Sequence, residues 1–375
     1  MASPVASTAP DDLFGADLYA ALGGQGNLVF SPGNIGTALR MTLLGARGPT
    51  ATQLAAVLHL AKPQDAAAGL VQVSALLDEL ARGPITLRAP NTMWLQAGLP
   101  VQPDFTAALA QAACVQLREA DFRRAAEPAR QQINDLIAEQ TAGKITGLIP
   151  AGLLDAATRL VLASALYLKA AWAHPFPSGA TSDGPFHPEP GRERQVPVMH
   201  LRARLRYLRR DGYQVVELPY LGQRLGMVIV LPDGPLPPVE GLLAGGGLSG
   251  LLAGLATYQV SLALPRFRVT GQFGLGPVLT SLGMPLAFGP QADFTGITEA
   301  EPLHIREVVH QAYIDVAEPG TEAAAATATV ITAAARTLMP DPVAEMTVDR
   351  PFLFALTELT TGWPLFLGRV TDPAV

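Results

Sequence analysis

Residues 309–326 decide the fold, and they read Val309-His-Gln-Ala-Tyr-Ile-Asp-Val-Ala-Glu-Pro-Gly-Thr-Glu-Ala-Ala-Ala-Ala326. From Gln311 to Glu318, apolar and polar residues alternate as they do in a half-buried β-strand. A Pro-Gly turn signal follows, and then a segment with one charge, Glu322, and otherwise no side chain larger than isoleucine as far as residue 335. Because exposed loops are ordinarily polar, this composition suits a segment that lives in water and also enters a sheet.

If this segment became a strand, its side chains would alternate between two faces. One face would carry Thr321, Ala323, Ala325, Thr327, Thr329 and Ile331, and the other Glu322, Ala324, Ala326, Ala328 and Val330. We therefore expect the first face to enter the core while Glu322 stays in water, with Gly320 giving the backbone its freedom to pivot. An Ala-rich helix or flexible linker is the alternative, but the valine, the isoleucine and four threonines favour a strand.

The rest of the chain divides into a helix-rich first half and a strand-rich second half, which indicates an α+β fold. Ser31 suits the N-cap, and Pro32 the first position, of a helix running to about Gly45. Thr50 to Gln53 reads as a capping box. Further helices are expected at 11–22, 66–81, 103–113 and 127–140, and strands at 85–96, 160–169, 195–199, 204–209, 214–218, 225–231, 259–267, 311–318, 352–358 and 365–370.

Composition narrows the class of protein. The 375 residues include no linker or charge block, so we expect one domain spanning 1–375. A net charge of −6 disfavours nucleic acid as a partner, and the arginine clusters at 202–206 and 209–210 read as solvated strand edges, with an anionic partner as the alternative. The one cysteine, Cys114, is expected to be a small core residue. No run of about 20 apolar residues could span a membrane, and the start lacks signal-peptide features, so a cytoplasmic protein is expected unless a leader was removed.

Catalytic motifs are missing from the sequence. Gly247-Leu-Ser-Gly250 is one residue short of a nucleophile elbow and reads as a glycine-rich turn. The six histidines show no metal-ligand spacing, and no phosphate-binding loop occurs. We therefore expect no enzyme activity, no cofactor and no metal.

Several segments, in one order along the chain, resemble the serpin family. They are Asn27 to Ile35 (opening helix B), Thr141 to Ile149 (after helix F), Ser164 to Phe176 (strand 3 of sheet A), Leu218 to Tyr220 and Met227 to Pro232 (sheet B), Val309 to Ala326 (strand 5 of sheet A and the hinge), and Asp349 to Phe354 with Pro364 to Val370 (the chain end). The resemblance implies three β-sheets, eight or nine helices and an exposed reactive-centre loop at about 320–346.

The resemblance also implies a function: a serine protease cuts the loop, which then inserts into sheet A and traps the covalent acyl-enzyme. The hinge would be Gly320, Thr321, Glu322, Ala323, Ala324, Ala325 and Ala326. The polar "shutter" of the family would be Ser31, Asn34, Ser164 and His310, and the "breach" residue would be Trp172. Because the usual strand-3 asparagine is Ser164 and a usual helix-B serine is Asn34, we expect Asn34 to bond to His310, with a plain core histidine as the alternative.

The family's spacing, counted from Glu318 as the first residue, makes Ala334 the seventeenth. The scissile bond is therefore expected between Ala334 and Ala335, which suits elastase-like or subtilisin-like proteases. The alternative is Arg336–Thr337, which a trypsin-like protease would cut. A further alternative is a non-inhibitory serpin-fold chaperone or carrier. The protein is expected to be a monomer that polymerises on heating.

Overall fold

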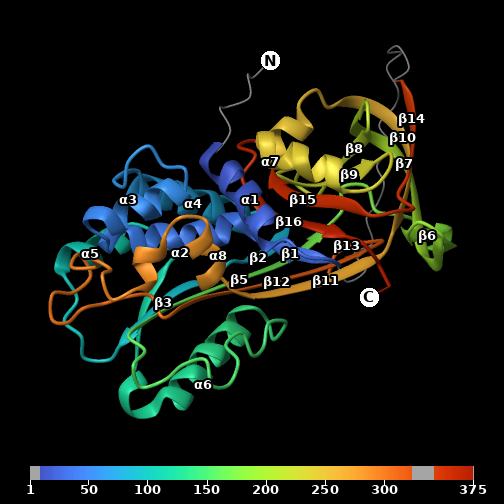
Figure 1. Ribbon diagram of the computed structural model, residues 1–375. Helices are drawn as coiled ribbons and strands as arrows, with labels where there is room; N and C mark the ends of the chain where they lie inside the picture. Colours follow the sequence, from blue (N-terminus) through green and yellow to red (C-terminus); the bar gives the residue numbers. More distant parts are fainter. Residues whose placement is uncertain (1–8, 323–341, 375) are drawn as a thin grey trace.

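A computed structural model describes residues 9–322 and 342–374 and shows an α+β architecture (Figure 1). The described residues form eight α-helices: α1 Ala9–Leu22, α2 Pro32–Gly45, α3 Gly48–Val57, α4 Asp65–Ala81, α5 Pro103–Leu109, α6 Phe122–Gln140, α7 Pro237–Leu252 and α8 Gly276–Ser281. The strands are β1 Leu28–Phe30, β2 Ile85–Arg88, β3 Asn91–Gln96, β4 Gln116–Ala120, β5 Leu160–Ala171, β6 Ser182–Glu189, β7 Arg192–Arg210, β8 Tyr213–Pro219, β9 Leu225–Pro232, β10 Ala256–Pro265, β11 Phe267–Gly274, β12 Glu307–Ala317, β13 Gly320–Thr321, β14 Val343–Thr347, β15 Phe352–Glu358 and β16 Pro364–Val370. In this part of the chain no helix is long and apolar enough to cross a membrane.

Local signals account for α2 but not for α3. Ser31 caps α2 as predicted, and the proline follows at the first helical position. The predicted capping box is wrong, because α3 begins two residues before Thr50. The Thr50 hydroxyl instead accepts a hydrogen bond from Asp293 N, and the Gln53 side chain accepts one from Leu286 N. The side chains that could have capped the helix therefore accept hydrogen bonds from backbone N–H groups distant in sequence.

The segment read as a glycine-rich turn belongs to α7. This helix is kinked at Gly247, whose φ of 67° suits glycine. The Asp12 carboxylate of α1 accepts hydrogen bonds from Leu248 N at 2.6 Å and Ser249 N at 3.0 Å. These contacts cap the second half of α7, so a carboxylate from another helix lets the helix resume after the glycine.

A seven-stranded sheet has the order β11-β12-β13-β5-β3-β4, with β2 also paired to β5. In Figure 1, α6 lies apart from the other helices, against one face of this sheet. Val161 and Ala163 of β5 pack with Ile133 of α6, whereas Leu160 and Leu162 face the main core. Both faces of β5 are therefore buried, which explains its nearly continuous apolar sequence.

The other two sheets implied by the resemblance are joined through β7. This 19-residue strand pairs with β6 and β10 along most of its length and with β8 from Arg206 to Arg210. The path β1-β16-β15-β9-β8-β7-β10-β14, with β6 also paired to β7, is therefore one nine-stranded hydrogen-bonded sheet. The two separate strands expected at 195–199 and 204–209 are parts of β7.

The expected boundaries of the reactive-centre loop are too wide. Gly320 and Thr321 already form β13, and Val343–Thr347 forms β14, which pairs in parallel with β10. In β14 the side chains of Ala344 and Met346 are buried while their neighbours are exposed, the alternation of a half-buried strand. Ala323 to Ala326 and both candidate scissile bonds lie outside the described residues.

Candidate functional site at the opening of the seven-stranded sheet

The start of the hinge is a third strand between β5 and β12. Thr321 is antiparallel to Ala170 of β5 and to Val316 of β12. Gly320 has a φ of 148°, and a Cβ there would lie 2.0 Å from the carbonyl oxygen of Ala170. Only glycine fits this close approach, so the predicted pivot is a place where two backbones meet.

Two aromatic residues form a floor under the hinge. The hydroxyl groups of Tyr220 and Thr321 lie 2.6 Å apart, and both side chains are buried. Tyr220 stacks on Trp172 with ring centroids 4.4 Å apart. The Trp172 indole donates to Ala317 O and its backbone N donates to Pro319 O, both at 3.0 Å. Burial raises the pKa of Tyr220, so its hydroxyl stays protonated and forms an ordinary hydrogen bond with the Thr321 hydroxyl.

The expectation that Glu322 stays in water is wrong. Its side chain is 7% exposed and its carboxylate lies 2.7 Å from Lys144 Nζ. Lys144 belongs to the segment after α6 and reaches Glu322 on the face opposite the core, where the neighbouring Lys169 is exposed. Burial and then a hydrogen bond with Glu322 raise the pKa of Tyr167 to about 12. Lys144 Nζ also lies 5.9 Å from the ring centroid of Tyr313.

A second buried carboxylate lies just before the hinge. Glu318 is bound by the Arg266 guanidinium and by the Thr181 hydroxyl, which donates at 2.5 Å. Burial acts to raise the pKa of Glu318, but these hydrogen bonds outweigh it and hold that pKa below its usual value. The carboxylate therefore stays charged and ties the end of β12 to Arg266, between β10 and β11, and to the segment before β6.

His310 joins β12 to β5 and α2 below the hinge. Its Nδ1 lies 2.8 Å from the Ser164 hydroxyl, and its Nε2 accepts a hydrogen bond from Ser31 N at 3.0 Å. Because a backbone N–H donates to Nε2, the neutral ring carries its proton on Nδ1 and donates it to Ser164. Burial lowers the pKa of His310 to about 3, so the ring stays neutral at physiological pH.

The expected bond between Asn34 and His310 is wrong. The Asn34 amide donates to Ala165 O at 2.7 Å, and its Oδ1 accepts from Asn91 Nδ2 at 2.6 Å. Asn34 thus links α2 to β5 and β3, while the Ser164 side chain and the Ser31 backbone serve the histidine. The four polar residues expected together do lie together, but with different partners.

The residues of this site that sequence reasoning missed include Asn91, Lys144, Tyr220 and Arg266. Two of them stand in segments that carry the resemblance, Lys144 after α6 and Tyr220 after β8. No local pattern connects them with the hinge, because their partners are far away in sequence. Only the positions of the strands and the covering segment bring them together.

Other parts of the described chain offer little chemistry. In residues 9–322 and 342–374, no group of three or more His, Cys, Asp or Glu side chains could hold a metal ion. Cys114 is partly buried against the core, and burial raises the pKa of its thiol to about 11. It is therefore a poor nucleophile.

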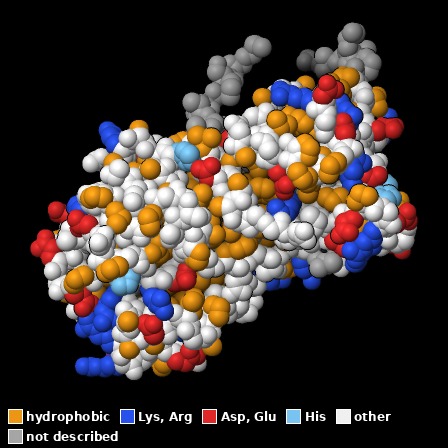
Figure 2. All heavy atoms as spheres, in the orientation of Figure 1, with side chains coloured by type: hydrophobic (Ala, Val, Ile, Leu, Met, Phe, Trp, Pro, Cys, Tyr) orange, Lys and Arg blue, Asp and Glu red, His pale blue; other side chains and the backbone are white. Residues whose placement is uncertain are grey.

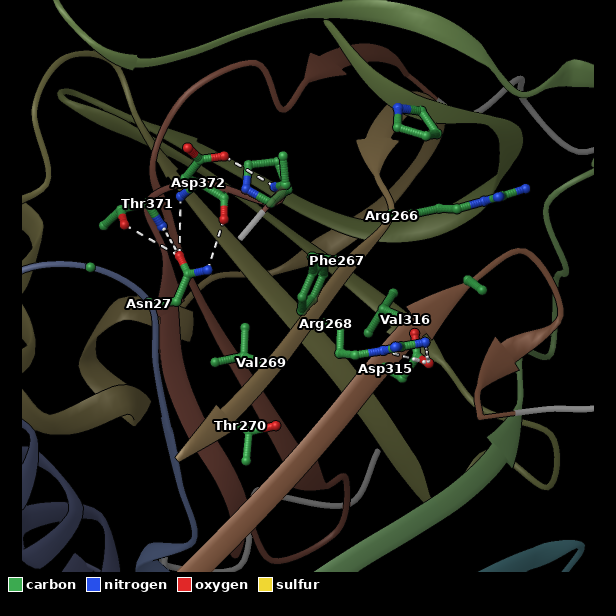
Figure 3. Close-up of a pocket in the computed structure, with 15 residues that line it drawn as sticks. Asn27, Arg266, Phe267, Arg268, Val269, Thr270, Asp315, Val316, Thr371 and Asp372 are labelled. Atoms are coloured by element: carbon green, nitrogen blue, oxygen red, sulfur yellow. Dashed lines mark hydrogen bonds and ion pairs between the residues drawn. The ribbon is translucent and has the colours of Figure 1, made fainter. Parts of the chain in front are cut away.

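A pocket of about 930 Å³ lies beside β11 and the chain end (Figure 3). Its polar groups bond to one another: Asn27 Oδ1 accepts from Thr371 N at 2.8 Å, and Arg268 donates to Asp315 at 2.8 Å. The candidate hinge, shutter and breach residues are not among those that line it.

Among the described residues, two of the five arginines in the clusters of β7 form ion pairs with acidic side chains. Arg206 pairs with Glu217 at 2.9 Å, and Arg209 pairs with Asp233 at 2.9 Å. Over the face in Figure 2, acidic and basic side chains lie beside one another in most places. This arrangement favours the interpretation as solvated strand edges.

Comparison with known proteins identifies the family. The family model described as serpin (serine protease inhibitor) matches residues 11–373. An uncharacterized serpin-like protein of Thermococcus kodakarensis is 38% identical over 363 residues, which cover 96% of this chain and 84% of that protein. The leukocyte elastase inhibitor of the pig, Sus scrofa, is 36% identical over 379 residues, covering 98% of this chain and 99% of the inhibitor.

A solved structure agrees with these matches. The crystal structure of a highly specific serpin of the insect Tenebrio molitor superposes with a TM-score of 0.85 at 30% identity and covers 97% of both chains. Serpins are generally protease inhibitors and not enzymes, and the partners of these inhibitors are proteases. With matches that span nearly the whole length at these identities, the chain belongs to the serpin family.

Proposed function

We propose that this protein is an irreversible suicide-substrate inhibitor of serine proteases, acting as one domain over residues 1–375. The observation that carries the proposal is the position of β13: Gly320 and Thr321 already lie between β5 and β12, at the end where these two strands do not pair with each other directly. A cut loop could lengthen β13 in place.

In the proposed reaction the protease serine oxygen attacks the carbonyl carbon of Ala334. The peptide bond to Ala335 breaks, the new amino terminus leaves with a proton from the protease, and an ester joins the two proteins. Insertion of the freed hinge then carries the esterified protease away from the top of the sheet. If insertion outruns attack by water on the ester, the protease stays trapped.

The register of β13 supports insertion along the whole sheet. Six residues after Thr321 is Thr327, six before Ala170 is Ser164, and six before Val316 is His310. Ser164 and His310 are themselves paired across β5 and β12, so a lengthening strand would meet both at one level. Six β5–β12 residue pairs must part for this to happen.

The same register bears on the scissile bond. Leu160, the first residue of β5, lies ten before Ala170, so the lengthened strand would end at Ile331, ten after Thr321. Ala334 would lie three residues beyond that end and Arg336 five. Two extra residues would leave about 6–7 Å of slack at strand rise, which weakens the pull on the protease. We therefore propose cleavage between Ala334 and Ala335, by an elastase-like or subtilisin-like target.

The test is to mix the protein with elastase-like, subtilisin-like and trypsin-like proteases and look for a complex that survives SDS. Mass spectrometry of the released peptide gives the cut, with an N-terminus at Ala335 expected. An N-terminus at Thr337 would make the protein an inhibitor of trypsin-like enzymes, cut at Arg336. Cleavage without any stable complex would overturn inhibition and favour the chaperone or carrier alternative.

The proposal also covers the state of the uncut protein. It would be a monomer whose unfilled part of the sheet can accept the loop of a neighbour on mild heating. Size-exclusion chromatography before and after heating measures this, and a loop-cleaved sample is the control, because its own loop fills the sheet.

A further inference from the structure

Glu322 is the one charged residue of the hinge, and its side chain is largely buried. Its side chain is 7% exposed, and its backbone N donates to Asp315 O at 3.0 Å, continuing the ladder of β13. Its φ of 48° is uncommon for a residue with a side chain. A carboxylate in such a place needs a counter-charge, because an unpaired buried charge is strongly unfavourable.

Lys144 supplies that counter-charge from a firmly held turn. The Thr141 hydroxyl bonds to Ile137 O at 2.7 Å and accepts from Ile145 N at 3.3 Å, and both Thr141 and Ile145 are fully buried. The Gln272 side chain of β11 donates to Leu148 O at 2.9 Å, a few residues further on. The ammonium group is therefore placed over the sheet by the fold and is not carried there by the hinge.

Neighbouring cations are placed differently. Lys169 directly precedes Ala170 in β5 and lies beside the hinge. Its side chain is exposed, and it forms no ion pair within the described part of the chain. Arg268 donates to Asp315 at 2.8 Å and is thus already paired. Of these three cations, Lys144 is the one that forms an ion pair with Glu322.

We propose that Lys144 is a positioning residue for loop insertion: it neutralises the Glu322 carboxylate, whose unpaired charge would otherwise draw the start of the hinge out of the sheet before the loop is cut. This inference rests on the proposed function. With Gly320 and Thr321 held in place, the first step of strand growth is complete, and insertion continues from an existing ladder. The Thr321–Tyr220 contact holds the core side of the same two residues, and the ion pair holds the other side.

Removing the cation should shift the competition between trapping and turnover. In Lys144→Met the Glu322 carboxylate would keep its hydrogen bond with Tyr167 but lose its counter-charge, so the start of the hinge would leave the sheet. Insertion would then begin later after each cut, and hydrolysis of the ester would win more often. The number of inhibitor molecules consumed per trapped protease should rise several-fold, while the rate of the first cut should stay the same.

Rescue separates this role from a merely structural one. Glu322→Gln removes the charge that needs a partner, so Lys144→Met/Glu322→Gln should trap protease nearly as well as the unaltered protein. Lys169→Met, which also removes a lysine beside the hinge, is the matched control and should change nothing. A double variant no better than Lys144→Met would overturn the proposal, because loss of packing against Tyr313 would then explain the effect.

A second measurement does not depend on inhibition. Hydrogen exchange at the Glu322 amide, which bonds to Asp315 O, should be slow in the unaltered protein, fast in Lys144→Met and slow again in the double variant. Equal exchange in all three would overturn the proposal even if trapping is efficient. If no protease is ever trapped but the exchange pattern holds, the proposed function fails and the ion pair as the device that holds the hinge stands.

Discussion

The two ends of the β5–β12 pair are built from the same strands but differ in how those strands pair. At the upper end β13 separates them, and Thr321 lies between Ala170 and Val316. At the lower end residues 161–166 pair directly with 307–312. At the lower end both faces of β5 are buried, whereas at the upper end Lys169, on the face away from the core, is exposed. The first two hinge residues thus form a third strand at the upper end, whereas β5 and β12 would have to part before a strand could lie between them at the lower end.

The polar contacts differ in the same way. At the open end the hydroxyl of Tyr220 and the ammonium of Lys144 hold the hinge from its two sides. At the closed end the Ser164–His310 bond joins the two strands that would have to part. The contacts that hold the hinge therefore lie at one end of the β5–β12 pair, and the bond that joins the two strands directly lies at the other end.

Insertion of the cut loop as a full-length strand between β5 and β12 should have the largest effect on stability. A single cut in the segment 323–341 should raise the melting temperature by about 10–20 °C, if about ten new ladder residues each contribute roughly 1 kcal/mol. Calorimetry of intact and cut protein measures this. Equal melting temperatures would mean that the cut loop does not insert between β5 and β12, and would favour the carrier or chaperone alternative.

Blocking the open end should be next in size. Thr321→Arg would place a charge where the side chain is 0% exposed, at a cost of several kcal/mol. The cut loop should then fail to insert, and the protein should become a substrate. The SDS-stable complex should disappear from gels. Leu242→Arg, on the exposed side of α7, is the control, and trapping by Thr321→Arg would mean that the inward face is misassigned.

Acid should weaken the closed end. The pKa of His310 falls from 6.5 to about 3 on burial, so the unfolded chain binds a proton more readily between these values. This contribution to stability is complete above pH 6.5 and is lost as the pH falls toward 3, at up to about 1.4 kcal/mol per pH unit.

Urea unfolding at several pH values, for the unaltered protein and for His310→Gln, isolates this contribution. The difference in pH slope between them should match it. His174→Gln, at an exposed histidine, should keep the original slope. An unchanged slope in His310→Gln would contradict the buried neutral state of the ring.

The smallest effect is expected from Tyr220→Phe. It leaves the Thr321 hydroxyl without its partner at the floor of the hinge, at a cost of about 1–3 kcal/mol in hinge docking. Exchange of the Thr321 amide should become faster. Adding Thr321→Val removes the second hydroxyl and should restore most of the protection, whereas Tyr207→Phe in the nine-stranded sheet should have no effect. Exchange unchanged in Tyr220→Phe would exclude the hydroxyl contact as a support of the hinge.

Much of the fold followed from short-range patterns. The Ser31 cap and the following proline predicted the start of α2, and the apolar run beginning at Leu160 predicted a strand buried on both faces. Such signals succeed because capping and side-chain alternation involve residues within a few positions of one another. They failed at Gly247, where a carboxylate from α1 lets a helix continue through a glycine-rich segment.

The sequence by itself determined that the hinge is small, nearly uncharged and able to alternate, and that Thr321 belongs to the inward face. Only the tertiary structure decided that Glu322 is enclosed beside Lys144, that Ser164 rather than Asn34 serves His310, and that β7 joins two sheets. The physical reason is range. Composition and periodicity are properties of neighbours along the chain, whereas an ion pair or a buried hydrogen bond depends on which distant segments the packed core brings within about 3 Å.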